Sequence, residues 1–166
     1  MTYPGVNDHL ELRDSGGFEA GADDTIKETV EYISSNQLGN LASQIHCIWY
    51  VISCASEQPI QAIDEKFLTG QLVNTGEIPI FVIFTKYDVF VEQIQRKYKL
   101  LDMQSAEEKA YECFKTNLEG RLKSIVGDNP RFSICRVALV DMEEWMPKYT
   151  TTGKAVSLSR LSHIDT

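Results

Sequence analysis

The chain has 166 residues, of which 43% are hydrophobic and 24% charged, and this suits one soluble globular domain. Its formal net charge of −8 repels nucleic acid and anionic membranes, so neither is expected as a partner. No apolar run approaches the length of a membrane span, and the N-terminus lacks the pattern of a signal peptide. We therefore expect a single cytoplasmic domain over residues 1–166, with its core at about 8–150 and a tail at 151–166.

The four cysteines form no CxxC pair, which favours free thiols in a reducing compartment. Cys47 and Cys135 lie inside apolar runs, so we expect them to be buried. The three histidines are scattered along the chain and are interpreted as structural residues.

The first half of the chain alternates strand and helix patterns. Residues 8–14 alternate apolar and polar side chains, which predicts a strand with one buried face. Residues 23–36 begin with two acids and predict a helix, whose apolar stripe consists of Ile26, Val30 and Ile33. The continuous apolar run at 45–52 predicts a strand covered on both faces. Residues 59–73 predict a helix with Pro59 in its first turn.

The second half continues this alternation. Residues 78–84 predict a second fully buried strand that leads directly into the sequence TKYD. Two helical patterns follow at 89–101 and 105–127, and the second is expected to end at its terminal glycine. Residues 131–140 predict a further strand, and residues 141–151 a short last helix.

This order of elements predicts an α/β fold with three layers, in which a mainly parallel sheet carries helices on both faces. Ligands of such sheets bind beyond the carboxyl ends of the strands. Two polar loops are expected at such ends, namely Asp14-Ser15-Gly16-Gly17 and Thr85-Lys86-Tyr87-Asp88. The sequence therefore places a candidate binding site at this edge of the sheet.

The residue types of the two loops suit a purine nucleotide. A carboxylate held at a strand end offers two oxygens to the paired donors of guanine, which discriminates guanine from adenine by about 1–3 kcal/mol. A lysine stem in the same loop can lie along the purine ring. An acid in the other loop can hold a Mg²⁺ water, and a following glycine N–H can reach a terminal phosphate.

The order of a DxxG motif and then an [NT]KxD motif, each after a predicted strand, resembles the pattern of the P-loop GTPase superfamily. The sequence around these motifs is similar to that of fungal Ras-like G-domain proteins. The resemblance covers residues 8 to about 140. It implies a small-GTPase type of protein that binds GTP or GDP with Mg²⁺. Asp88 would accept the guanine donors, Lys86 would flank the base and Thr85 would brace the loop.

The resemblance also implies roles around the phosphates. Asp14 would sit near Mg²⁺, and Gly17 would offer its N–H to the γ-phosphate. Glu19 is the candidate for orienting the attacking water, and Ala138 is the nearest candidate for a third loop beside the base. Residues alone leave two alternatives open, because Asp88 could simply cap the following helix and Asp14 could be a turn residue.

The chain departs from the superfamily in several respects, above all because no GxxxxGK[ST] phosphate loop is present. The switch threonine segment is also missing, Phe18 stands where a water-orienting glutamine is usual, and the usual Ser-Ala-Lys is absent near Ala138. Gly153 and Lys154 form part of such a motif, but Lys148 stands in place of its first glycine and Ala155 in place of Ser or Thr. We expect the chain to start inside the family's fold, after the first strand and phosphate loop. Losing about four charge-assisted bonds costs on the order of 6 kcal/mol, or about four decades in affinity, so hydrolysis is expected to be weak or compromised.

In the family's sheet the missing strand would lie between residues 8–14 and 45–52. Three arrangements could replace it: the flanking strands pair directly, the tail joins the sheet, or two chains pair. We favour a homodimer. A different functional class is also open, in which the chain is a pseudo-GTPase that keeps the fold without nucleotide and acts through protein partners.

Overall fold

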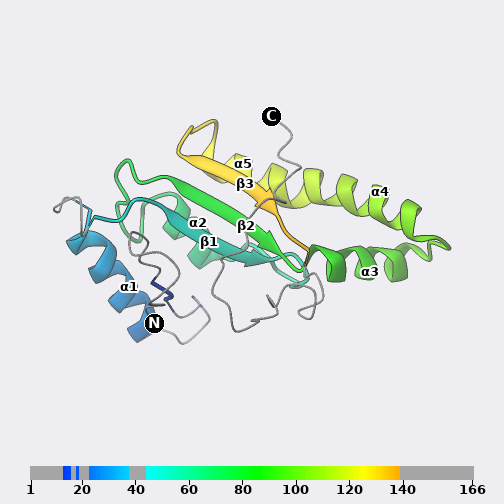
Figure 1. Ribbon diagram of the computed structural model, residues 1–166, viewed down its shortest axis with the longest axis horizontal. Coiled ribbons are helices and arrows are strands. Elements are labelled where there is room, and N and C mark those ends of the chain that lie inside the picture. Colours follow the sequence, from blue (N-terminus) through cyan, green and yellow to red (C-terminus); the bar gives the residue numbers. More distant parts are fainter. Residues whose placement is uncertain (1–12, 16–17, 19–22, 38–43, 139–166) are drawn as a thin grey trace, which may run out of the picture.

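The computed structural model describes residues 13–15, 18, 23–37 and 44–138 (Figure 1). The predicted strand at 8–14 lies mostly outside these ranges, and its described residues 13 and 14 have no regular secondary structure. The predicted helix at 141–151 lies outside them. The elements follow the order α1 (Asp23–Ser35), β1 (Ile48–Ser53), α2 (Ala62–Leu68), β2 (Ile80–Thr85), α3 (Tyr87–Tyr98), α4 (Met103–Cys113), the π-helix η1 (Phe114–Glu119), α5 (Gly120–Val126) and β3 (Phe132–Arg136).

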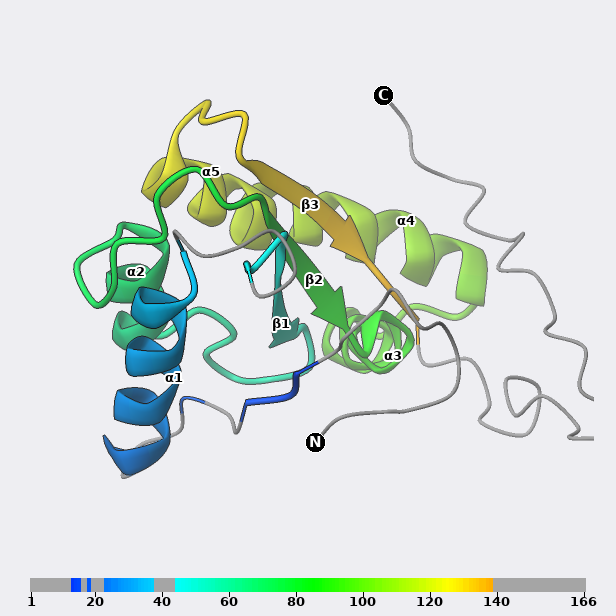
Figure 2. The same ribbon diagram turned by 60° about the vertical axis from the view of Figure 1, so that its left-hand side comes forward.

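The described strands form one parallel sheet in the order β1-β2-β3 (Figures 1 and 2). Trp49 of β1 lies opposite Phe81 of β2, which in turn lies opposite Ser133 of β3. Helices follow each of the first two strands in the chain, as parallel crossovers require. The predicted α/β class with a parallel sheet is therefore confirmed at this coarse level.

One face of the sheet is covered by helices and forms the core. Alternate strand residues point to this face and are buried, among them Tyr50, Ile52, Val82 and Phe84. They pack in one cluster with apolar side chains of α1, α2, η1 and α5, including Ile33, Phe67, Phe114 and Leu122. Fully burying one such side chain stabilises the fold by about 1.5–3 kcal/mol, so this cluster holds the domain together.

The opposite face of the sheet is exposed, although its side chains are apolar. Trp49 is 56% exposed, Val51 61% and Phe81 39%. The prediction that residues 45–52 and 78–84 are covered on both faces is therefore wrong for the described structure. The reason is that the helices in the core cluster pack against the Tyr50 and Val82 side. In Figure 1 the sheet lies in front of α2 and α5.

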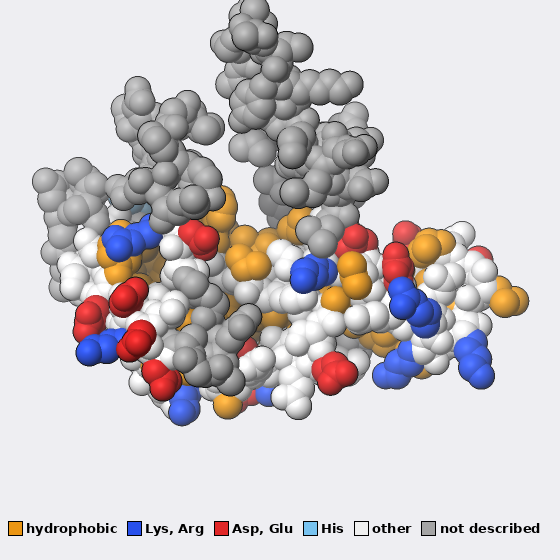
Figure 3. Space-filling model, turned by 90° about the horizontal axis from the view of Figure 1, so that it is seen from below, with side chains coloured by type: hydrophobic (Ala, Val, Ile, Leu, Met, Phe, Trp, Pro, Cys, Tyr) orange, Lys and Arg blue, Asp and Glu red, His pale blue; other side chains and the backbone are white. Residues whose placement is uncertain are grey.

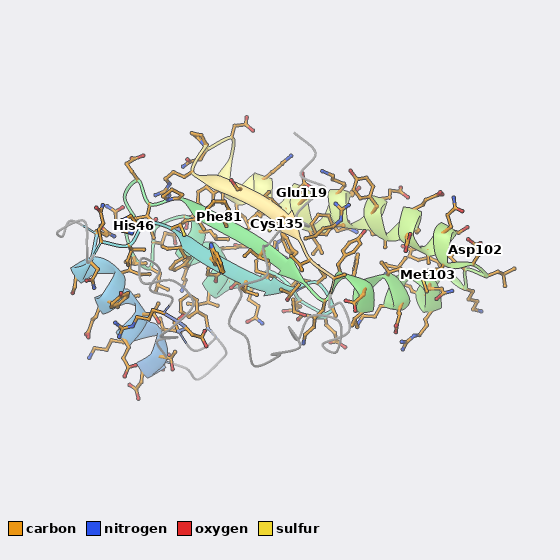
Figure 4. All side chains as sticks on the ribbon, in the orientation of Figure 1. His46, Phe81, Asp102, Met103, Glu119 and Cys135 are labelled. Atoms are coloured by element: carbon orange, nitrogen blue, oxygen red, sulfur yellow. The ribbon has the colours of Figure 1, made fainter. Side chains whose placement is uncertain are left out.

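The two cysteines expected to be buried, Cys47 and Cys135, are exposed instead, whereas the other two are buried. All four are free thiols, as predicted. Cys135 is in register with Ile83 and Val51, and therefore belongs to the exposed face; it is labelled with Phe81 in Figure 4.

Helix α2 begins at Ala62 rather than at Pro59, because Gln61 and Asp64 form a capping box at that point. The Asp64 carboxylate accepts a hydrogen bond from the Gln61 N–H at 2.6 Å and another from the Tyr50 hydroxyl at 2.5 Å. This acid therefore ties the start of α2 to the covered face of β1.

The long helical pattern predicted at 105–127 is present as α4, η1 and α5 in succession, and it begins two residues earlier, at Met103. It ends at Gly127 as predicted, where φ is 65° and glycine is favoured. The π-helical stretch was not foreseen. A Cβ at Gly120 would approach the Lys115 carbonyl oxygen to 3.3 Å, so the small residue suits the exit from this stretch.

Candidate functional site at the carboxyl ends of the strands

The sequence TKYD forms the connection between β2 and α3, at the carboxyl edge of the sheet. Strand β2 ends at Thr85, and α3 begins at Tyr87. The single residue between them, Lys86, adopts the left-handed conformation with φ 58° and ψ 38°. This region costs a residue with a Cβ about 1–2 kcal/mol. Such conformations cluster at functional sites, where the surrounding structure enforces them.

Hydrogen bonds from both neighbouring strands hold this connection in place. On one side, the Cys54 N–H donates to the Thr85 carbonyl at 2.9 Å, and the Thr85 hydroxyl donates to the Ile52 carbonyl at 3.4 Å. On the other side, the Tyr87 N–H donates to the Val137 carbonyl at 3.3 Å. Thr85 therefore links the end of β2 to the neighbouring strand β1.

Asp88 is half-buried in the first turn of α3. The N-cap of this helix is Lys86, whose side chain makes no capping hydrogen bond. The alternative that Asp88 is the N-cap is therefore wrong. An acid in the first turn is favoured by the helix dipole, which stabilises its ionised form by about 0.3–1 kcal/mol.

Ala138 is exposed and follows directly after Val137, which pairs with the TKYD connection. The Val137 N–H also donates to the Phe84 carbonyl at 2.7 Å. The structure thus brings the end of β3 beside Thr85–Asp88, and Ala138 lies next in the chain.

An arginine that sequence reasoning missed contacts the start of α3 at this edge. The guanidinium carbon of Arg136 lies 5.1 Å from the ring centre of Tyr87, 4.8 Å from that of Tyr111 and 5.7 Å from that of Phe114. Cation–π contacts of this kind contribute about 0.5–1 kcal/mol each at exposed sites. The three rings come from three different helices, so no local sequence signal could have identified this contact.

Two titratable groups near Arg136 are held in their neutral forms by burial. Burial raises the pKa of the Tyr87 hydroxyl, an effect that Arg136 partly offsets. Burial also raises the pKa of the Cys54 thiol to about 11. Because the thiolate is the reactive form of cysteine, Cys54 is unsuited to act as a nucleophile at neutral pH.

The other predicted loop lies against different elements. The Arg13 guanidinium carbon is 3.8 Å from the ring centre of Tyr32 in α1. The ring of Phe18 packs against Tyr50 and Phe67, with ring centres 6.1 and 5.5 Å apart. These partners belong to α1, β1 and α2, and none belongs to the TKYD connection.

Of the residues predicted to handle phosphate and metal, Asp14 is exposed, whereas Gly17 and Glu19 lie outside the described residues. Within the described ranges no three His, Cys, Asp or Glu side chains gather into a group that could hold a metal ion. Asp14 is therefore a single candidate ligand in that part of the chain.

A pocket of about 190 Å³ lies beside Cys54, the residue that follows β1. Its lining includes Cys54, Phe90, Ile94, Cys113 and Leu118, from the β1–α2 loop, α3, α4 and η1. None of Thr85, Lys86 and Asp88 lines it, so it is separate from the TKYD connection.

Comparison with known proteins identifies no relative, because no protein-family model, curated protein or solved structure matches the chain. No helix among the described residues is both long and apolar enough to cross a membrane.

Proposed function

We propose that the chain binds guanine nucleotides through Thr85, Lys86 and Asp88, with weak or no hydrolysis of GTP. The observation that carries this proposal is the left-handed conformation of Lys86 at the carboxyl end of a central parallel strand. The chain accepts an unfavourable backbone geometry there, and ligands of parallel α/β sheets bind at this edge.

Each residue of the connection has a physical role in this proposal. Asp88 would accept the two adjacent donors on the Watson–Crick edge of guanine, as a carboxylate in a bidentate pair. The aliphatic stem of Lys86 would lie along the purine ring. Thr85, bonded to the Ile52 carbonyl, would keep the connection in register with β1. Adenine lacks the paired donors, so ATP would lose this interaction.

Few of the described residues would bind the phosphates of the nucleotide. Mg²⁺ in nucleotide sites needs one or two carboxylates together with the phosphates themselves. Asp14 fits the part of one such ligand, but it belongs to no group of three or more His, Cys, Asp or Glu side chains within the described ranges. Mg²⁺ would then arrive with the nucleotide. Because recognition rests mainly on the base, we expect GTP and GDP to bind alike, at about tens of micromolar or weaker.

Calorimetric titration with GTP, GDP and ATP, each with Mg²⁺, tests the proposal. Saturable heat with both guanine nucleotides, and none with ATP, is expected for the wild type. Asp88→Ala should remove the guanine preference, since it deletes both acceptor oxygens. The matched control is Asp128→Ala, which removes an exposed acid from the loop before β3, at the opposite end of the sheet. Unchanged guanine affinity in the Asp88 variant would contradict the proposal.

A second candidate is a pseudo-GTPase that binds protein partners and no nucleotide. The exposed apolar face of Trp49, Val51 and Phe81 favours it, because large exposed apolar patches commonly mark interaction sites. Thermal unfolding separates the two candidates. A ligand at 10–100 times its Kd stabilises the folded state by about 1.4–2.7 kcal/mol, or several degrees in Tm. A Tm that does not change when millimolar GTP or GDP is added supports the pseudo-GTPase.

A further inference from the structure

The outer edge of β1 presents backbone groups that the described sheet does not use. The Ile48 N–H donates to the Pro79 carbonyl and the Cys54 N–H to the Thr85 carbonyl, both at 2.9 Å. Backbone groups alternate in direction along a strand, so the even-numbered residues of β1 face β2. The N–H and C=O groups of Trp49 and Val51 therefore point away from β2. Within the described residues, β1 pairs with β2 alone.

Strand β1 itself lacks the sequence features that usually prevent an edge strand from pairing with another chain. Natural edge strands are protected by charged side chains, proline, bulges or short length. Strand β1 has the sequence IWYVIS, with no charge and no proline. Its six residues are each matched by one residue of β2, so it has no bulge. The side chains of Trp49 and Val51 are more than half exposed.

Charge indicates which partner suits this edge. The chain carries a net charge of −8, so two copies repel one another over most of their surfaces. The stretch 32–56, however, contains no Asp, Glu, Lys or Arg. Strand β1 itself therefore brings no like charge against a second copy. Figure 3, seen from below Figure 1, shows hydrophobic side chains at the surface in the middle of the molecule, between charged groups on either side.

We propose that β1 pairs antiparallel with β1 of a second copy of the chain, which joins two described three-stranded sheets into one sheet of six strands. A twofold axis at Val51 would set outward-facing residues opposite one another, as antiparallel hydrogen bonding requires. The Phe18 ring contacts Tyr50 through its side chain, so that contact leaves the outward backbone groups of Trp49 and Val51 unused.

Val51→Pro is the sharpest test, because proline removes an N–H that faces outward and is not needed for pairing with β2. Val51→Thr is the matched control, since it keeps both this N–H and a β-branched shape at the same exposed position. Sedimentation equilibrium of the full chain over about two decades of concentration gives the oligomeric state. We expect a wild-type dimer, a dimer dissociation constant raised about 100-fold in Val51→Pro, and a change below about tenfold in Val51→Thr.

A wild-type chain that is monomeric at every concentration overturns the proposal, and so does a Val51→Pro dimer as tight as the wild type. The first result would mean that another part of the same chain, or a different protein, occupies the edge. Circular dichroism establishes whether Val51→Pro is folded. If it is not, Val51→Lys replaces it, since two like charges near the twofold axis should separate the copies while a monomeric edge strand tolerates lysine. The measurement needs no nucleotide, so its outcome is independent of the proposed function.

Discussion

The two faces of one small sheet differ sharply although both are apolar. On the covered face Val82 and Phe84 are fully inaccessible to solvent, while their neighbour Phe81 on the other face is 39% exposed. The contrast arises within a single strand, from residues one position apart. Within the described ranges, the helices therefore concentrate the buried apolar contacts on one side of the sheet, while apolar side chains on the other side remain exposed.

The largest expected effect comes from truncating one phenylalanine on each face. Phe84 is fully buried and meets Phe114 edge-on, with ring centres 5.2 Å apart. Phe84→Ala should lower the free energy of unfolding by about 3–5 kcal/mol, because it deletes contacts and leaves a cavity. Phe81→Ala should lower it by about 1–2 kcal/mol, since water already reaches that ring. Urea denaturation measures both, and equal losses would mean that the exposed face is covered in solution.

A smaller effect is expected from the acid on the covered side. Glu119 is only 8% exposed and lies 2.8 Å from Lys115 and 2.9 Å from Lys123 (Glu119 is labelled in Figure 4). Burial alone would raise the pKa of its carboxyl, but hydrogen bonds from the two lysines outweigh burial and lower it. Glu119→Gln should therefore destabilise the domain by about 1–2 kcal/mol at neutral pH, because bonds to an ionised group are lost.

The pH dependence of that effect has a definite sign. A carboxyl whose folded pKa is lowered contributes stability above its ordinary pKa, here 4.5, and loses it as the pH falls through the folded value. The difference between wild type and Glu119→Gln should shrink as the pH drops below about 4.5. Glu112→Gln, whose pair with Lys109 lies on the exposed surface, should change stability by less than about 0.5 kcal/mol at any pH. A difference that persists unchanged at pH 3 would contradict the assignment.

The sequence was sufficient to predict features that depend on local pattern. The helix with the stripe through Ile33, the alternation of strands and helices that follows it and the glycine end of α5 all follow from spacing and turn residues. The position of TKYD after a strand was also correct, because an apolar β-branched run ending in polar residues is a local signal.

The features that could not be predicted from the sequence depend on contacts between elements that are distant in the chain. An uninterrupted apolar run predicts a strand with two covered faces, yet Trp49 and Val51 are exposed because the packed helices cover the opposite face. Arg136 reaches rings from α3, α4 and η1, which no spacing rule brings together. The π-helical stretch likewise has no sequence pattern that distinguishes it from the α-helices on either side.

The smallest expected change in stability comes from replacing the lysine at either end of α3 by glycine. Comparing the two variants distinguishes a structural role of Lys86 from a role in nucleotide binding. Lys86 precedes this helix and Lys99 follows it, and both adopt positive φ, at 58° and 53°. Glycine occupies this region without a Cβ penalty but loses more entropy on folding, so Lys99→Gly should stabilise the domain by about 0.5–1 kcal/mol. The same change at Lys86 relieves the same backbone cost and should stabilise it to a similar extent. If the TKYD connection reads guanine, however, only Lys86→Gly removes the side chain that flanks the base. We therefore expect both variants to gain stability in urea denaturation, and Lys86→Gly alone to lose guanine affinity in calorimetry. If both lysines can be replaced without effect on nucleotide binding, the left-handed conformation of Lys86 is a feature of the helix start and has no role in recognising a base.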